Sequence, residues 1–177
     1  MQTSTDVWET IAVEAERESH LWRDALRRPD ERDTEAVFSP LGEGRYALGV
    51  ETIYEGYLMH YGRPRLFGPR DGDTSLLLGD YLYAHGLVRI ADVGSVEAVA
   101  DLAELISLCA QLRADGAPGD GVAWAASAAL LGAGQLDDAR AALRDDGDAE
   151  LLTALAEAHV GRAALGDALA AHDRRLR

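Results

Sequence analysis

Hydrophobic residues recur at helical spacing along most of this chain, and no segment shows the two-residue alternation of a half-buried strand. A first helix is predicted over residues 5–28, ending before Pro29. Its apolar positions are Trp8, Ile11, Ala15, Trp22 and Leu26. Further helices are predicted over residues 46–61, 74–91, 95–114, 120–133, 135–144, 148–164 and 166–176. The pattern therefore predicts an all-α fold.

The predicted helices fall into three parts that together suit one helical bundle. Residues 1–45 form an N-terminal helix and a polar connector, and residues 46–91 form a helix pair joined by a loop rich in glycine and proline. Residues 92–177 are rich in alanine and leucine. With 177 residues the chain is long enough to bury a substantial core. We therefore expect a single-domain helical bundle.

Composition narrows the classes of function. The formal charge is −14, and every basic residue other than histidine is arginine. Such acidity argues against nucleic-acid binding, which needs basic side chains to neutralise phosphates. No segment reaches about 18 uninterrupted apolar residues, as a membrane span requires, and the N-terminus lacks a signal-peptide pattern. The single Cys109 lies among apolar residues and is expected to be a buried small hydrophobe. A cytoplasmic location is predicted.

Two short motifs carry the strongest functional signal. Gly62-Arg63-Pro64 is followed, seventeen positions after Gly62, by Gly79-Asp80-Tyr81-Leu82. These motifs resemble the Arg-Arg-Gly-x-Pro turn and the Ala-Gly-Asp-Tyr-Leu helix of the polyprenyl synthetase (trans-isoprenyl diphosphate synthase) family. The resemblance covers about a fifth of the chain and implies a truncated isoprenoid-synthase-like fold.

In that family an Asp-rich box, DDxxD, precedes the turn and holds Mg²⁺ ions that bind an allylic diphosphate. The same register places the box on residues 51–55, where Glu51 and Glu55 match its outer acidic positions. The resemblance thus implies a vestigial Mg²⁺ site at these two residues, since Mg²⁺ prefers hard oxygen ligands. His60 and Tyr61 replace the paired arginines that would grip phosphate. The alternative interpretation is that Glu51 and Glu55 form a solvated helix face.

Residues 56–70 contain no acid but include three arginines, which makes a basic segment in an acidic chain. Together with His60 and Tyr61, the arginines of this segment are candidates for binding a diphosphate or an acidic partner: Arg63, Arg65 and Arg70. Balancing nearby acids is the third interpretation. Asp80 is expected to be a buried, hydrogen-bonded carboxylate without a catalytic role.

The family's second Asp-rich box and its upstream diphosphate-binding segment have no convincing counterpart. Residues 145–148 are acidic, but their glycine favours a loop between helices. No catalytic residue is therefore assigned. The leading hypothesis is a non-catalytic subunit that pairs with a catalytic prenyl diphosphate synthase, as the small subunit of heteromeric synthases does. The alternatives are a helical interaction scaffold without prenyl chemistry and a weak Mg²⁺-dependent prenyltransferase.

Overall fold

The computed structural model describes residues 4–176, and within that range the chain is helical without a strand. The α-helices are α1 (Ser4–Glu18), α2 (His20–Ala25), α3 (Ala47–Tyr61), α4 (Gly72–Asp92), α5 (Val96–Asp115), α6 (Asp120–Ala129), α7 (Asp137–Asp146), α8 (Glu150–Val160) and α9 (Arg162–Leu176). Short 3₁₀ helices occupy Pro29–Glu31, Ser39–Leu41 and Gly44–Tyr46. The all-α prediction is confirmed.

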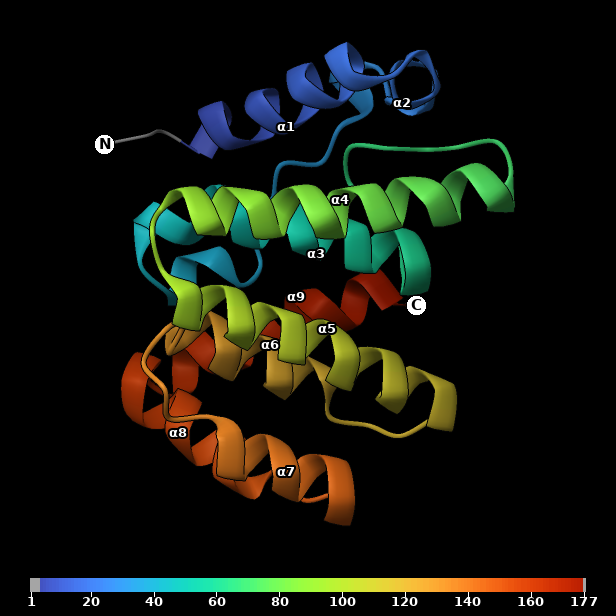
Figure 1. The fold of residues 1–177 in the computed structure, drawn as a ribbon. Helices are drawn as coiled ribbons and strands as arrows, with labels where there is room; N and C mark the ends of the chain where they lie inside the picture. Colours follow the sequence, from blue (N-terminus) through green and yellow to red (C-terminus); the bar gives the residue numbers. More distant parts are fainter. Residues whose placement is uncertain (1–3, 177) are drawn as a thin grey trace.

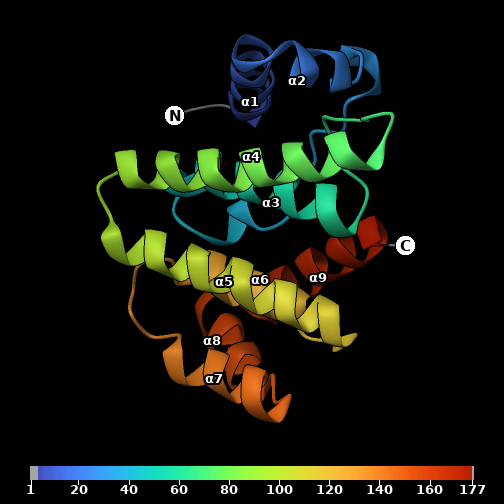
Figure 2. The same cartoon turned by 45° about the vertical axis from the view of Figure 1, so that its right-hand side comes forward.

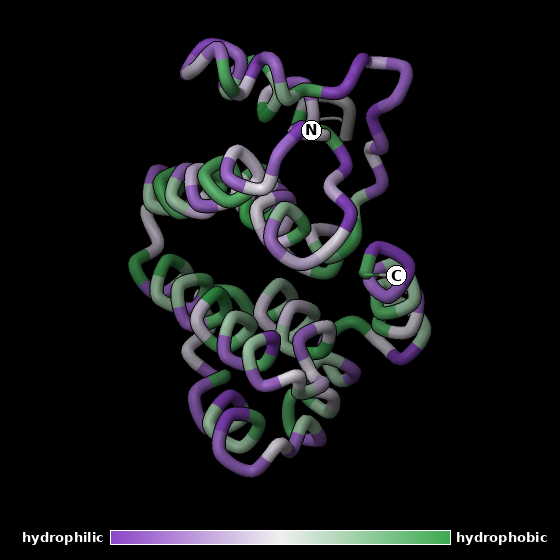
Figure 3. Tube along the Cα trace, turned by 90° about the vertical axis from the view of Figure 1, so that its right-hand side faces the viewer, coloured by the Kyte–Doolittle hydropathy of each residue, from purple (hydrophilic) through white to green (hydrophobic). Residues whose placement is uncertain are grey.

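The helices are stacked in layers (Figure 1). Helices α1 and α2 cover one side of the antiparallel pair α3–α4, while α5, α6 and α9 lie on its other side. The pair α7–α8 lies furthest from the N-terminal layer, and a view turned by 45° gives the same order (Figure 2). The polar connector that follows α2 runs down one side of the stack (Figure 3).

Helix α3 is the centre of the fold because it is covered on both sides. Every residue from Gly49 to Met59 is buried. One hydrophobic cluster joins α3 to α5, α6, α8 and α9, and a smaller one joins α1 and α2 to α3, α4 and the loop between them. Among residues 4–176, no helix is both long and apolar enough to cross a bilayer.

Glycines bring α3 and α4 into close contact. A Cβ atom added at Gly56 would lie 2.9 Å from the carbonyl oxygen of Gly79. One added at Gly79 would lie 2.5 Å from Nε2 of His60. The pair resembles small-residue helix packing, in which missing side chains let two backbones approach. Gly79 therefore has a packing role.

Several local predictions need correction. The helix predicted over 5–28 is broken at Ser19, whose side chain accepts a hydrogen bond from the N–H of Leu21 and caps α2. Helix α4 starts at Gly72, two residues before the predicted start at Thr74, because the carboxylate of Asp71 accepts the N–H and the hydroxyl of Thr74 and caps the helix. The predicted start at Ser95 is confirmed. Gly147 ends α7 in the left-handed conformation, but residues 145 and 146 still belong to α7, so the loop predicted over 145–148 is only partly correct. The helix predicted over 148–164 is broken at Gly161, between α8 and α9.

Candidate functional site

The predicted acidic pair, Glu51 and Glu55, lies inside the protein. Their exposed fractions are 1% and 0%, so the interpretation as a solvated helix face is wrong. The reason is the position of α3, whose every side faces another element. Buried carboxylates need a partner that offsets their lost hydration. Here that partner is Arg65, from the loop between α3 and α4.

The guanidinium of Arg65 joins both carboxylates. Its Nε donates to Oε2 of Glu55 at 2.9 Å, and one terminal nitrogen donates to Oε2 of Glu51 at 2.6 Å. The backbone N–H groups of Arg65 and Leu66 both donate to Oε1 of Glu55 at 2.8 Å. Arg65 also donates to the carbonyl oxygens of Glu35 and Glu51. We call Glu51, Glu55 and Arg65 the buried triad.

Aromatic rings enclose the buried triad. The guanidinium carbon of Arg65 lies 4.4 Å from the centroid of Trp8, on α1, and 5.0 Å from that of Tyr54, on α3. Both distances are within the range of cation–π attraction. Burial alone would lower the pKa of Arg65, but the two carboxylates raise it above its ordinary value. Arg65 is therefore a permanent cation in the core.

This arrangement limits what the acidic pair can do. Three of its four carboxylate oxygens already accept hydrogen bonds, and only Oε1 of Glu51 is buried without one. Within residues 4–176 no set of three histidine, cysteine, aspartate or glutamate side chains is grouped to hold a metal ion. A divalent cation at Glu51 and Glu55 would have to displace a hydrogen-bonded guanidinium.

A second buried polar network was not predicted from the sequence. Nδ1 of His172, on α9, lies 2.8 Å from the hydroxyl of Tyr54, and its Nε2 lies 3.2 Å from Oδ2 of Asp120. Asp120, at the first turn of α6, also accepts hydrogen bonds from the Tyr57 hydroxyl and from Arg113. The network thus fastens α9 to α3, α5 and α6.

The pKa values in this network follow its geometry. Burial would raise the pKa of Asp120, but hydrogen bonds from His172 and Tyr57 and the charge of Arg113 hold it well below its ordinary value. Burial raises the pKa of Tyr57, and the adjacent Asp120 raises it further. The sequence carries one indication of this network. The spacing of His172 from Leu165 and Ala168 places it on the apolar face of α9.

The other arginines of the predicted basic segment face solvent. The side chain of Arg63 donates to the carbonyl oxygen of Arg174, and its N–H donates to the carbonyl oxygen of Arg175 at 2.9 Å. Arg70 is exposed beside Pro69 and Asp71. Arg65 differs from Arg63 and Arg70 because its guanidinium is paired with Glu51 and Glu55 in the core.

The remaining candidates lie where α3 meets α4. His60 and Tyr61 are partly buried, and the ring of His60 stacks on Tyr83 with centroids 5.1 Å apart. Burial lowers the pKa of His60, although Asp80 lies 3.2 Å from its Nε2. Asp80 is 66% exposed, so the prediction of a buried carboxylate is wrong: it lies at the solvent-exposed edge of the contact between α3 and α4.

The other motif residues contribute to packing. Leu82 is buried between α1 and α3, and the ring of Tyr81 packs at a tilt against Trp22 of α2 with centroids 5.6 Å apart. Gly62 ends α3, and its N–H donates to the carbonyl oxygen of Leu58. Pro64 lines two surface hollows. Cys109 is buried as predicted, and burial raises the pKa of its thiol.

Comparisons of the chain with protein-family models, curated proteins and solved structures found no match. The resemblance to polyprenyl synthetases accordingly rests on the two motifs and their spacing alone.

Proposed function

We propose that this chain is a non-catalytic, truncated isoprenoid-synthase-like subunit that pairs with a catalytic trans-prenyl diphosphate synthase and alters the length or stability of its product. The observation that carries the proposal is the buried triad. At the position where the resemblance implies a Mg²⁺-binding box, the two remaining carboxylates are both paired with the guanidinium of Arg65. This favours a chain without its own metal-dependent ionisation of a diphosphate.

The outer face of α4 supports a partner surface. Leu77 and Val88 are 56% and 55% exposed and lie eleven residues apart, about three helical turns, so they share one face. Ala84 is exposed between them. At the start of α5, Val96 is 78% exposed. An apolar strip of this kind is typical of an interaction surface. The same strip would serve a scaffold with no prenyl chemistry, so the partner must be identified directly.

Two experiments test the proposal. The purified chain, given Mg²⁺, an allylic diphosphate and isopentenyl diphosphate, should transfer no prenyl group on its own. The double variant Leu77→Glu/Val88→Glu should lose a synthase that co-purifies with the native chain, whereas Leu151→Glu, at a 45% exposed leucine of α8, should retain it. Prenyl transfer by the isolated chain would favour the weak-enzyme alternative and exclude a non-catalytic role. Equal retention by all variants would exclude α4 as the contact.

A further inference from the structure

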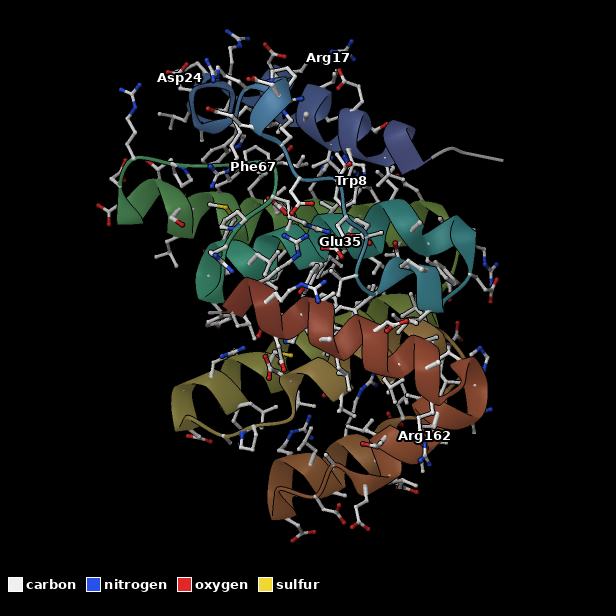
Figure 4. All side chains as sticks on the ribbon, turned by 180° about the vertical axis from the view of Figure 1, so that it is seen from behind. Trp8, Arg17, Asp24, Glu35, Phe67 and Arg162 are labelled. Atoms are coloured by element: carbon white, nitrogen blue, oxygen red, sulfur yellow. The ribbon has the colours of Figure 1, made fainter. Side chains whose placement is uncertain are left out.

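A groove runs along the loop that connects α3 to α4. Two adjoining hollows, of about 330 and 340 Å³, share Arg27 and Pro64 in their walls. One hollow extends toward the C-terminal end of α9, and the other extends toward Arg70 and the start of α4. Figure 4 shows the loop region around Phe67 near Glu35, on the same side of the molecule. We call these two hollows the arginine groove.

The arginine groove reverses the charge balance of the chain. Apart from Arg65, whose charge is paired with Glu51 and Glu55 in the core, five arginines and four acids line it: Arg27, Arg63, Arg70, Arg174 and Arg175, with Glu31, Asp33, Glu35 and Asp71. The whole chain has 17 basic and 31 acidic residues, apart from histidine. A concave surface lined by one excess charge concentrates the opposite charge from solution. The groove is therefore a local attractor for anions in an acidic protein.

Most of these arginines already have a partner. Arg65 belongs to the buried triad, while Arg175 pairs with Asp33 and Glu35 at 2.9 Å. Arg174 pairs with Glu35 at 3.2 Å, and Arg63 donates to the carbonyl oxygen of Arg174. Within residues 4–176, the side chains of Arg27 and Arg70 have neither an ion pair nor a hydrogen bond.

Arg27 and Arg70 line the same hollow but come from two different segments, one after α2 and one between α3 and α4. Arg27 follows α2 and is only partly exposed, and its guanidinium lies across Gly68, where an added Cβ would approach it to 3.3 Å. Arg70 follows Pro69, two residues after Gly68 in the loop between α3 and α4. The nearby Asp71 is occupied, because its two oxygens accept the N–H and hydroxyl of Thr74 at 2.8 Å. Two arginine side chains without a hydrogen bond or ion pair among the described residues thus line one hollow.

We infer that the arginine groove binds a small phosphate-type anion, with Arg27 and Arg70 as its two ligating side chains. A guanidinium offers parallel N–H donors that match a phosphate group, and such charge-assisted hydrogen bonds are among the stronger ones. Inorganic phosphate, inorganic diphosphate and the head group of an organic phosphate share this chemistry. The inference does not require a partner subunit, so it stands or fails separately from the proposed function.

Calorimetric titration of the full chain with inorganic phosphate and with inorganic diphosphate tests the site. Binding should be saturable, and diphosphate should bind more tightly than phosphate because it presents more charged oxygens to the two arginines. Arg27→Gln and Arg70→Gln should each weaken binding about tenfold or more, and the double variant should abolish it. Neither substitution removes a hydrogen bond or an ion pair within residues 4–176, so the circular dichroism spectrum should stay unchanged and Tm should change little.

Arg162→Gln is the matched control, because Arg162 lies at the opposite end of the molecule from Phe67 (Figure 4). Its binding should equal that of the native chain. Titration with an organic phosphate, compared with inorganic diphosphate, distinguishes a site that contacts only the phosphate group from one that also contacts the organic part of the ligand. The inference is overturned if the native chain binds neither anion at millimolar concentration, or if the double variant binds as well as the native chain.

Discussion

Replacing Arg65 by methionine tests the buried triad most severely. The substitution keeps much of the side-chain volume but removes four hydrogen bonds that the guanidinium donates to Glu35, Glu51 and Glu55. It leaves two carboxylates in the core without a cation. Removing one member of a buried ion pair typically costs about 3–5 kcal/mol. Since a typical domain is stable by about 5–15 kcal/mol, Arg65→Met should remove roughly a fifth or more of the total.

Urea unfolding at pH 7, followed by circular dichroism, measures this loss. Arg144→Met is the control, because Arg144 and Glu104 form a solvent-accessible pair at 2.9 Å, for which about 0–1 kcal/mol is expected. Adding Glu51→Gln and Glu55→Gln to Arg65→Met should restore part of the stability, since no uncompensated charge then remains in the core. A loss of less than about 1 kcal/mol for Arg65→Met would refute the reasoning.

Three further predictions concern packing and pH. Gly56→Ala should lower the free energy of unfolding by about 1–3 kcal/mol, because its Cβ would meet the backbone of α4; urea unfolding measures it. Gly166→Ala, in α9 with open space around it, should be neutral or stabilising by up to about 1 kcal/mol, and an equal loss at both glycines would contradict the packing argument. Because the folded-state pKa of Asp120 is depressed, its stabilisation is complete above the ordinary value of 3.8 and is lost as the pH falls through the folded-state value. Below pH 3.8, Asp120→Asn should therefore show a shallower decline of unfolding free energy than the native chain; identical slopes would contradict the assignment.

The helices could be predicted from the sequence because glycine and aspartate mark their ends. The left-handed glycines at 116 and 147 end α5 and α7 within two residues of the predicted boundaries. Ser19 was missed because apolar spacing continues across it, and only the capping hydrogen bond separates α1 from α2. Helix existence thus follows from local pattern, whereas a break without glycine or proline depends on the cap that tertiary structure selects.

The environment of the candidate site could be predicted much less well. The positions of Glu51 and Glu55 on one helix were predicted, but their burial depends on layers contributed by distant parts of the chain. Arg65 lies in a loop, and loop sequence does not fix whether an arginine points into the core or to solvent. Likewise, the exposure of Asp80 depends on which face of α4 packs against α3. Local sequence identifies candidate groups, and tertiary packing decides their partners.

Isolation of the native chain under gentle conditions, with mass spectrometry of whatever remains bound, tests the proposed function most directly. The proposal predicts a full-length prenyl diphosphate synthase with intact Asp-rich boxes, whose product length or yield changes when this chain is removed. A stable partner without prenyl chemistry, or a synthase whose products are the same with and without the chain, would contradict it.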